Sequence, residues 1–165
     1  MRLSEPYRRL NEELHRTRST YGASGHRNVH LVRELMQRHD TTDVLDYGCG
    51  KATLSAQIGC RNYDPCIPRF SDEPEPADIV TCLDVLEHVE PACLQAVLEH
   101  LQSLTRVALL AVVATHPDRS KNLPDGSNPH RIVQPGHWWV ETLGGYFRVT
   151  DHKEAEKDVT VWALR

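Results

Sequence analysis

The chain has 165 residues, of which 39% are hydrophobic and 25% charged, and its formal net charge is −4. This composition is typical of a globular protein, and the length predicts a single domain over residues 1–165. Mild acidity, concentrated over residues 71–100, disfavours a broad cationic surface for duplex DNA. No apolar run approaches the about 20 residues that span a bilayer, so we expect no membrane partner.

Helical periodicity marks the first forty residues. A charged helix is predicted over residues 5–18, a glycine-containing segment follows at 21–25, and a second helix is predicted over about 28–39. The first residues contain no apolar segment of a signal peptide. Five cysteines without C-x-x-C spacing fit neither a disulfide framework nor a zinc ribbon. We therefore expect a cytoplasmic protein and no metal-binding residue.

From residue 43 onward, short apolar runs alternate with helical segments. Strands are predicted at 43–46, 60–63, 77–83 and 106–115, and helices at 53–58, 91–104 and 137–143. Two further strands, 147–152 and 158–164, are joined by a short turn, which predicts an antiparallel hairpin at one edge. The alternation predicts an α/β fold with a mostly parallel sheet that is covered by helices on both faces.

The most informative motif follows the first predicted strand and contains Asp46, Gly48 and Gly50. A glycine-rich turn at the carboxyl edge of a parallel sheet lets a ligand approach the backbone closely. Asp46 precedes the first glycine by two residues, and Asp64 ends the next strand, where a carboxylate suits a ribose diol. Two acids without an additional phosphate-binding cation indicate a cationic nucleoside rather than a dinucleotide.

These residues resemble motif I of the class I S-adenosylmethionine-dependent methyltransferases, D-x-G-C-G-x-G with an acid after strand 2. A second match, residues 77–89, is similar to strand 4 of small-molecule members and the L-E-H-V turn that follows it. The resemblance covers about residues 43–115. It implies a Rossmann-like, doubly wound sheet in residues 41–165, with the N-terminal helices of residues 1–40 covering the cofactor site.

The sequence departs from the family pattern in two places. Ala52 stands where the third glycine of motif I is expected, a small change that still permits helix packing. Only thirteen residues separate Asp64 from Asp78, too few for a helix, a strand and another helix. The third strand and its flanking helix are therefore expected to be reduced or missing.

The resemblance implies S-adenosylmethionine as the cofactor. The glycine turn would hold the methionine part, Asp64 the ribose hydroxyls, and Asp84 the floor near the sulfonium. The predicted cofactor-binding residues are Asp46, Gly48, Cys49, Gly50, Asp64, Leu83 and Asp84, with Tyr21 and Arg27 from the segment that would close over the cofactor. A simple connection between two helices explains the segment of Tyr21 and Arg27 equally well.

Methyl transfer requires alignment of the acceptor, the methyl group and the leaving sulfur, and a hydroxyl or amine acceptor also needs a base. The catalytic candidates are residues at predicted strand ends: Asp84, His88, His116 and His130. The loop of residues 116–130 and the Trp138-Trp139 pair after it are expected to cover the acceptor, with one indole in the core. The expected acceptor is a small or accessible polar molecule, such as a sugar or a modified nucleotide, methylated on oxygen or nitrogen.

Two other functions remain open on the sequence. The shortened segment between Asp64 and Asp78 also suits a protein of this fold that binds a partner and does not catalyse. A dinucleotide oxidoreductase is disfavoured, because the segment from Gly48 to Thr53 lacks the last glycine of that fingerprint.

Overall fold

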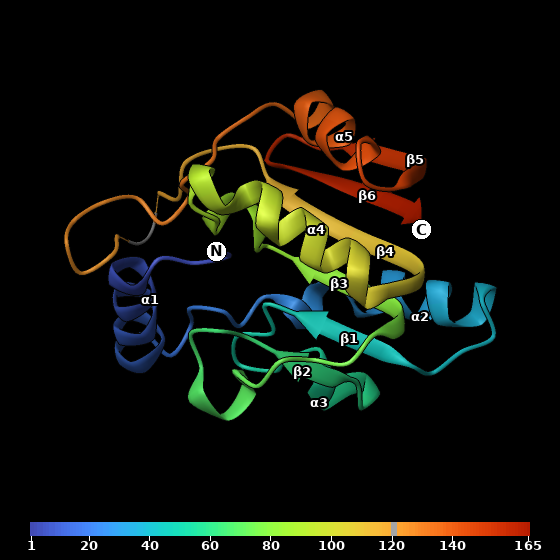
Figure 1. The fold of residues 1–165 in the computed structure, drawn as a ribbon, viewed down its shortest axis with the longest axis horizontal. Helices are drawn as coiled ribbons and strands as arrows, with labels where there is room; N and C mark the ends of the chain where they lie inside the picture. The colour runs from blue at the N-terminus through green and yellow to red at the C-terminus, as the bar shows by residue number, and fades with distance from the viewer. Residues whose placement is uncertain (120–121) are drawn as a thin grey trace.

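The computed structural model describes residues 1–119 and 122–165. Its core is a six-stranded sheet with the order β2-β1-β3-β4-β6-β5 (Figure 1). The strands are β1 (Val44–Tyr47), β2 (Arg61–Tyr63), β3 (Ala77–Leu83), β4 (Thr105–Ala114), β5 (Arg148–Glu154) and β6 (Asp158–Leu164). β1 to β4 are parallel, whereas β6 pairs antiparallel with both β4 and β5. This arrangement confirms the predicted α/β fold, its mostly parallel sheet and its C-terminal hairpin.

Helices cover both faces of the sheet. They are α1 (Glu5–Thr17), α2 (Val29–Arg38), α3 (Ser55–Ile58), α4 (Leu94–Leu104) and α5 (Gly136–Gly144), with short 3-10 turns at Gly25–Asn28, Pro68–Phe70, Leu86–His88 and Pro91–Cys93. Successive side chains of a strand point to opposite faces. In β3, Val80 accordingly packs with Leu98 of α4 and Trp139 of α5, whereas Ile79 packs with Val32 of α2. Both faces of β3 are therefore buried, as expected for a central parallel strand.

The predicted loss of one strand is confirmed between β2 and β3. Residues 64–76 are all described, and their only helix or strand is the 3-10 turn Pro68–Phe70. β2 is consequently an edge strand. The Arg61 guanidinium lies along this edge, where it donates hydrogen bonds to Asp43 Oδ1 at 2.7 Å and to the carbonyl oxygens of Glu75 and Pro76.

The N-terminal segment stands at the carboxyl ends of the parallel strands. Figure 1 shows α1 on the side toward which β1, β3 and β4 point. Tyr7 and Leu14 of α1, together with Tyr21, form a small buried cluster with Leu123 of the loop after β4. The segment is thus packed against the loops at the edge of the sheet where ligands of α/β proteins bind. No helix in the described part of the chain is both long and apolar enough to cross a membrane.

Candidate active site

A cavity of about 800 Å³ lies at the carboxyl ends of the parallel strands. This volume falls within the about 300–1,000 Å³ that is typical of small-molecule sites. The wall combines the N-terminal segment, the turn after β1 and the loops after β2, β3 and β4. The predicted residues that line it are Tyr21, Arg27, Gly48, Gly50, Asp64, Asp84, His88, His116 and His130. The structure therefore brings both halves of the predicted site to one cavity.

The glycine turn after β1 requires glycine at two positions. Gly48 and Gly50 adopt positive φ angles of 77° and 51°, in the left-handed region that favours glycine. A Cβ on Gly48 would lie 2.4 Å from Val85 Cγ2, and one on Gly50 would lie 2.3 Å from the oxygen of Gly22. Ala52, at the third motif position, keeps the left-handed conformation with a φ of 56°. Ala52 therefore adopts a backbone conformation that glycine would also favour at this position.

Asp64 supports the glycine turn from the end of β2. Its Oδ2 accepts a hydrogen bond from the Gly50 N–H at 3.0 Å, and its Oδ1 accepts one from the Cys66 N–H at 2.9 Å. A carboxylate offers about four lone-pair positions, so two remain for a ligand. His15 of α1, which the sequence analysis did not single out, places its Nε2 4.0 Å from Asp64 Oδ2. Burial lowers the pKa of His15, which favours its neutral form.

Three predicted cofactor residues are buried and are not part of the described cavity lining: Asp46, Cys49 and Leu83. The Asp46 Oδ1 accepts a hydrogen bond from Thr81 Oγ1 at 2.9 Å, and burial raises the pKa of Asp46 to about 7. Burial also raises the pKa of the Cys49 thiol, which disfavours a reactive thiolate. These residues support the turn and the strand ends from within the core.

The N-terminal segment is joined to both sides of the cavity. On one side, the Lys51 N–H donates to the Gly22 oxygen at 2.7 Å, and Lys51 Nζ donates to the His15 oxygen at 2.5 Å. On the other side, the Tyr7 hydroxyl donates to the His88 oxygen at 2.7 Å. α1 and the segment after it therefore span the cavity from the glycine turn to the loop after β3.

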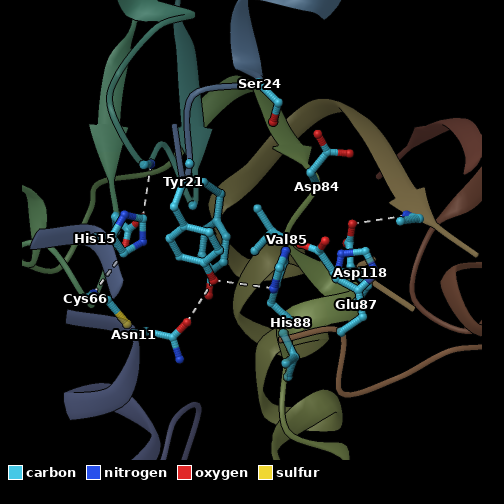
Figure 2. Close-up of a pocket in the computed structure, with 18 of the residues that line it drawn as sticks. Asn11, His15, Tyr21, Ser24, Cys66, Asp84, Val85, Glu87, His88 and Asp118 are labelled. Atoms are coloured by element: carbon cyan, nitrogen blue, oxygen red, sulfur yellow. Dashed lines mark hydrogen bonds and ion pairs between the residues drawn. The ribbon is translucent and has the colours of Figure 1, made fainter. Parts of the chain in front are cut away.

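Tyr21 occupies the middle of this span. Its hydroxyl donates to Asn11 Oδ1 at 2.9 Å, and its ring centroid lies 4.6 Å from that of His15 and 5.8 Å from that of His88. Figure 2 shows Tyr21 between these two histidines. Arg27 lies at the exposed rim of the same cavity. Both predicted residues of the segment thus reach the site, Tyr21 within the wall and Arg27 at its mouth.

Asp84 follows β3 in an unusual backbone conformation. Its φ is 56°, and its N–H donates to the Val112 oxygen at 2.9 Å, which fixes the turn to β4. A non-glycine residue in this region is uncommon, and such strain is concentrated at functional sites. Figure 2 shows the Asp84 carboxylate and the Ser24 hydroxyl directed into the same space. The turn therefore presents a half-buried carboxylate to the cavity.

The three predicted histidines come together in the cavity wall. The rings of His88 and His130 meet edge to face with centroids 4.8 Å apart, and the ring of His116 lies 5.8 Å from that of His130. Burial, followed by the neighbouring His130, lowers the pKa of His88 to about 3. His88 is consequently neutral at physiological pH.

Glu87 is a further member of this group that the sequence analysis did not select. Its side chain is completely buried, and its Oε1 accepts a hydrogen bond from the Ala114 N–H at 3.1 Å. Burial and then the charge of Asp84 raise the pKa of Glu87 well above its ordinary value. Glu87 is the glutamate of the L-E-H-V segment that the sequence analysis matched to the family. The segment alone does not show which way this side chain points.

The loop after β4 and the tryptophan pair require a correction. From this loop His116, Asp118 and His130 line the cavity, whereas residues 120–121 of the predicted loop lie outside the described residues. Neither Trp138 nor Trp139 is part of the described lining, so the expectation of an indole over the acceptor is wrong. The period of α5 turns Trp139 into the core against the sheet, and Trp138 packs half-buried beside it.

Comparison with known proteins identifies the fold. The chain matches no protein-family model and no curated protein. Its structure is similar to 1,6-didemethyltoxoflavin-N1-methyltransferase from Burkholderia thailandensis, solved with that substrate and S-adenosylhomocysteine. The TM-score is 0.63 at 14% identity, covering 99% of this chain and 91% of that one. Magnesium protoporphyrin IX methyltransferase from Synechocystis PCC 6803, solved with S-adenosylhomocysteine, gives 0.56 at 18% identity over 85% and 83% of the two chains.

The fold is that of the class I methyltransferases. The PH0226 protein from Pyrococcus horikoshii OT3 also shares it, with a TM-score of 0.62 at 15% identity over 92% of this chain and 98% of that one. In this chain, the class I methyltransferase fold places the glycine turn after β1, Asp64 after β2 and Asp84 after β3 around one cavity. The resemblance seen in the sequence and the observed topology therefore agree.

Proposed function

We propose that this protein is an S-adenosylmethionine-dependent methyltransferase that acts on an oxygen or nitrogen atom of a small or accessible polar acceptor. The observation that carries the proposal is the convergence of the glycine turn, Asp64 and Asp84 on one cavity of about 800 Å³. Two solved structures of the same fold contain S-adenosylhomocysteine, the product form of this cofactor, which supports the same assignment.

The residues of the cavity fit S-adenosylmethionine chemically. Gly48 and Gly50 present backbone without side-chain atoms, and Asp64 retains lone pairs that can accept hydrogen bonds from a ribose diol. The Asp84 carboxylate supplies a negative charge that favours a cationic ligand. When bound, the cofactor supplies a methyl group on a positively charged sulfur.

The chain's own residues would then align and deprotonate the acceptor. The segment from α1 to Arg27 crosses the cavity and would exclude water from it. His116 Nδ1 donates to the Pro117 oxygen at 2.8 Å, which leaves the lone pair on Nε2 and suits His116 as the base. In this proposal residues 1–165 form one domain in which residues 1–40 cover a core of residues 41–165.

The charge and the cysteines support the proposed partners and compartment. The half-buried Asp84 carboxylate at the wall disfavours a polyanionic duplex and favours a small molecule as the acceptor class. The cysteines of the described residues are free and buried, which suits a reducing cytoplasm.

Calorimetric titration with S-adenosylhomocysteine tests the first half of the proposal. Wild-type protein should bind one equivalent, and Asp64→Asn should bind at least tenfold more weakly, because the amide cannot accept every hydrogen bond that the carboxylate accepts. Asp72→Asn, an exposed acid outside the cavity lining, is the matched control and should bind as wild type does. Absence of binding by wild-type protein, or equal binding by both variants, would contradict the assignment.

A second candidate function rests on the missing strand beside β2. A class I methyltransferase fold with a shortened segment between β2 and β3 also suits a protein that binds cofactor and a partner without catalysis. Production of S-adenosylhomocysteine from S-adenosylmethionine, measured with panels of hydroxyl and amine acceptors, separates the two. Normal cofactor binding without product in every panel would favour the second candidate.

A further inference from the structure

Glu87, His88 and His130 form a cluster whose donor atoms converge within the cavity wall. One ligand atom from each residue lies within 4.8 Å of the other two, and no other group of three or more His, Cys, Asp or Glu in residues 1–119 and 122–165 gathers in this way. Glu87 and His88 come from the 3-10 turn after β3, and His130 comes from the loop after β4. Three separate backbone positions thus direct a carboxylate and two imidazoles toward one point.

The Glu87 carboxylate has one oxygen without a partner. Oε1 accepts the hydrogen bond from Ala114, but Oε2 is buried and has no hydrogen-bond partner among the described residues. The whole side chain is 0% exposed. Burying a polar atom without a partner is costly, and buried charges in proteins are paired or bind metals. A cation bound beside Oε2 would supply this partner and would take the place of the proton that burial favours on Glu87.

Hydrogen bonds to backbone carbonyls fix the orientation of both imidazoles. His88 Nδ1 lies 3.1 Å from the Pro129 oxygen, and His130 Nδ1 lies 2.5 Å from the His116 oxygen. A carbonyl oxygen can only accept, so each Nδ1 carries the proton and each Nε2 carries a lone pair. Metal-binding histidines are held in this way, with the second ring nitrogen donating to a carbonyl or carboxylate.

We propose that Glu87, His88 and His130 bind one divalent transition-metal ion. Two imidazoles and one carboxylate form a ligand set that suits zinc, cobalt, manganese or iron, and three protein ligands leave coordination positions open. All three side chains line the cavity, so the open positions face the space that also contains Asp84.

The proposed metal site also narrows the class of methyl acceptor. This inference rests on the proposed methyltransferase function. A bound metal would lower the pKa of a hydroxyl group that coordinates to it, so that the hydroxyl proton could pass to the Nε2 lone pair of His116 near neutral pH. The acceptor oxygen would then form the new bond to the methyl carbon as the bond from that carbon to the cofactor sulfur breaks, with S-adenosylhomocysteine as the leaving group. An amine must keep its lone pair for the methyl group, so coordination of that lone pair would block it. The site therefore favours an acceptor that is methylated on a hydroxyl oxygen.

The test is titration of chelator-treated full-length protein with Co²⁺, followed by visible absorption, and then displacement by Zn²⁺. Wild-type protein should bind one equivalent with an absorption band that Zn²⁺ removes. His130→Ala and the nearly isosteric Glu87→Gln should each weaken binding at least tenfold. His137→Ala, which removes an exposed histidine outside the cavity lining, should bind as wild type does and accounts for nonspecific binding by histidines.

Each outcome of this test decides the proposal. Absence of one-to-one binding by wild type, or equal binding by the cluster variants and the control, overturns the metal site. Circular dichroism checks that the variants are folded, and Glu87→Gln keeps the test valid if His130→Ala unfolds. Calorimetry with S-adenosylhomocysteine on metal-free protein is a separate readout. Cobalt binding without S-adenosylhomocysteine binding would leave the metal site standing while the methyltransferase function failed.

A last comparison tests the acceptor class. If the protein methylates hydroxyl acceptors, chelation should reduce that rate at least tenfold and added Zn²⁺ or Mn²⁺ should restore it. A rate that chelation leaves unchanged, or a preference for amines in the metal-loaded protein, would overturn the role of the metal in acceptor binding.

Discussion

The carbonyl oxygen of Gly22 accepts a hydrogen bond from the Lys51 N–H at 2.7 Å, in direct contact with the glycine turn. A Cβ on Gly50 would approach this same oxygen to 2.3 Å. The N-terminal segment and the turn after β1 thus fit together through two glycines, one on each side. The cover of the cavity and the proposed cofactor turn consequently form one structural unit.

Gly50→Ala should disrupt this unit. The new methyl group would collide with the Gly22 backbone, and alanine would have to adopt a φ of 51°. We expect a loss of more than about 2 kcal/mol in the free energy of unfolding and at least a tenfold loss of S-adenosylhomocysteine affinity. Chemical denaturation and calorimetry measure the two effects.

Gly59→Ala is the matched control for Gly50→Ala. Gly59 also has a positive φ, 72°, but a Cβ there would meet no described atom within 4 Å. We expect about 1 kcal/mol of destabilisation from the backbone alone and unchanged affinity for S-adenosylhomocysteine. Equal losses in the two variants would show that the Gly22 contact is unimportant.

Asp46→Asn should change how stability depends on pH. Burial raises the pKa of Asp46 from its ordinary 3.8 to about 7. Between these values the folded protein holds a proton that the unfolded chain releases, so the Asp46 contribution to the free energy of unfolding falls as pH rises. The asparagine variant has no titrating group at this position and therefore lacks this pH-dependent contribution. Its stability relative to wild type should increase from pH 4 to pH 7, by at most about 4 kcal/mol.

The quantity to measure is the difference in the free energy of unfolding between wild type and Asp46→Asn. His88 contributes in the opposite direction, because its pKa is lowered to about 3 and its share of stability rises with pH up to its ordinary value. This share is common to wild type and variant and cancels in their difference. Urea denaturation of ligand-free protein at several pH values gives that difference, and parallel profiles would refute the raised pKa of Asp46.

Tyr7→Phe should loosen the N-terminal cover. The substitution removes the hydrogen bond to the His88 oxygen, at 2.7 Å, and leaves that acceptor without its donor. We expect about 1–2 kcal/mol of destabilisation and faster proteolysis at the exposed residues 16–20. Tyr146→Phe, at a half-buried tyrosine between α5 and β5 that is not part of the described cavity lining, should leave both measurements unchanged. Identical proteolysis of the two variants would argue against a role of Tyr7 in holding α1.

Trp139→Phe should affect stability without affecting the site. Trp139 is 0% exposed, and its Nε1 has no hydrogen-bond partner among the described residues, so the variant loses packed volume only. We expect about 1–3 kcal/mol of destabilisation and no change in S-adenosylhomocysteine affinity or in the KM for an acceptor. A raised KM for the acceptor would show that the tryptophan pair contributes to the acceptor site after all.

Local sequence patterns predicted most of the fold, because the spacing of apolar residues and the glycine-rich turns can each be recognised within a short stretch of sequence. The strand at 77–83 and the hairpin at the end of the chain are observed where they were expected. The motif residues Gly48, Asp64 and Asp84 each follow a strand directly, and the structure places all three in the lining of one cavity.

Long-range packing explains what the sequence analysis missed. His15 reaches Asp64 only because α1 folds back across the glycine turn, and no local pattern in α1 distinguishes His15 from its polar neighbours. Glu87 and His130 meet because the loop after β4 returns to the end of β3, a path that no local pattern specifies. The tryptophan pair was misplaced for the same reason, because the position of α5 over the sheet depends on contacts with β5 and β6.

The short strand β2 also bears on the behaviour of the protein at high concentration. An unpaired sheet edge offers backbone groups to the edge of another molecule and is a common origin of aggregation. Here that edge is only the three residues Arg61–Tyr63, and the Arg61 side chain crosses it to reach Asp43 and the carbonyl oxygens of Glu75 and Pro76. A charged, three-residue edge is a poor template for a further strand. The loss of one strand from the fold therefore leaves an edge at β2 that disfavours pairing with another molecule.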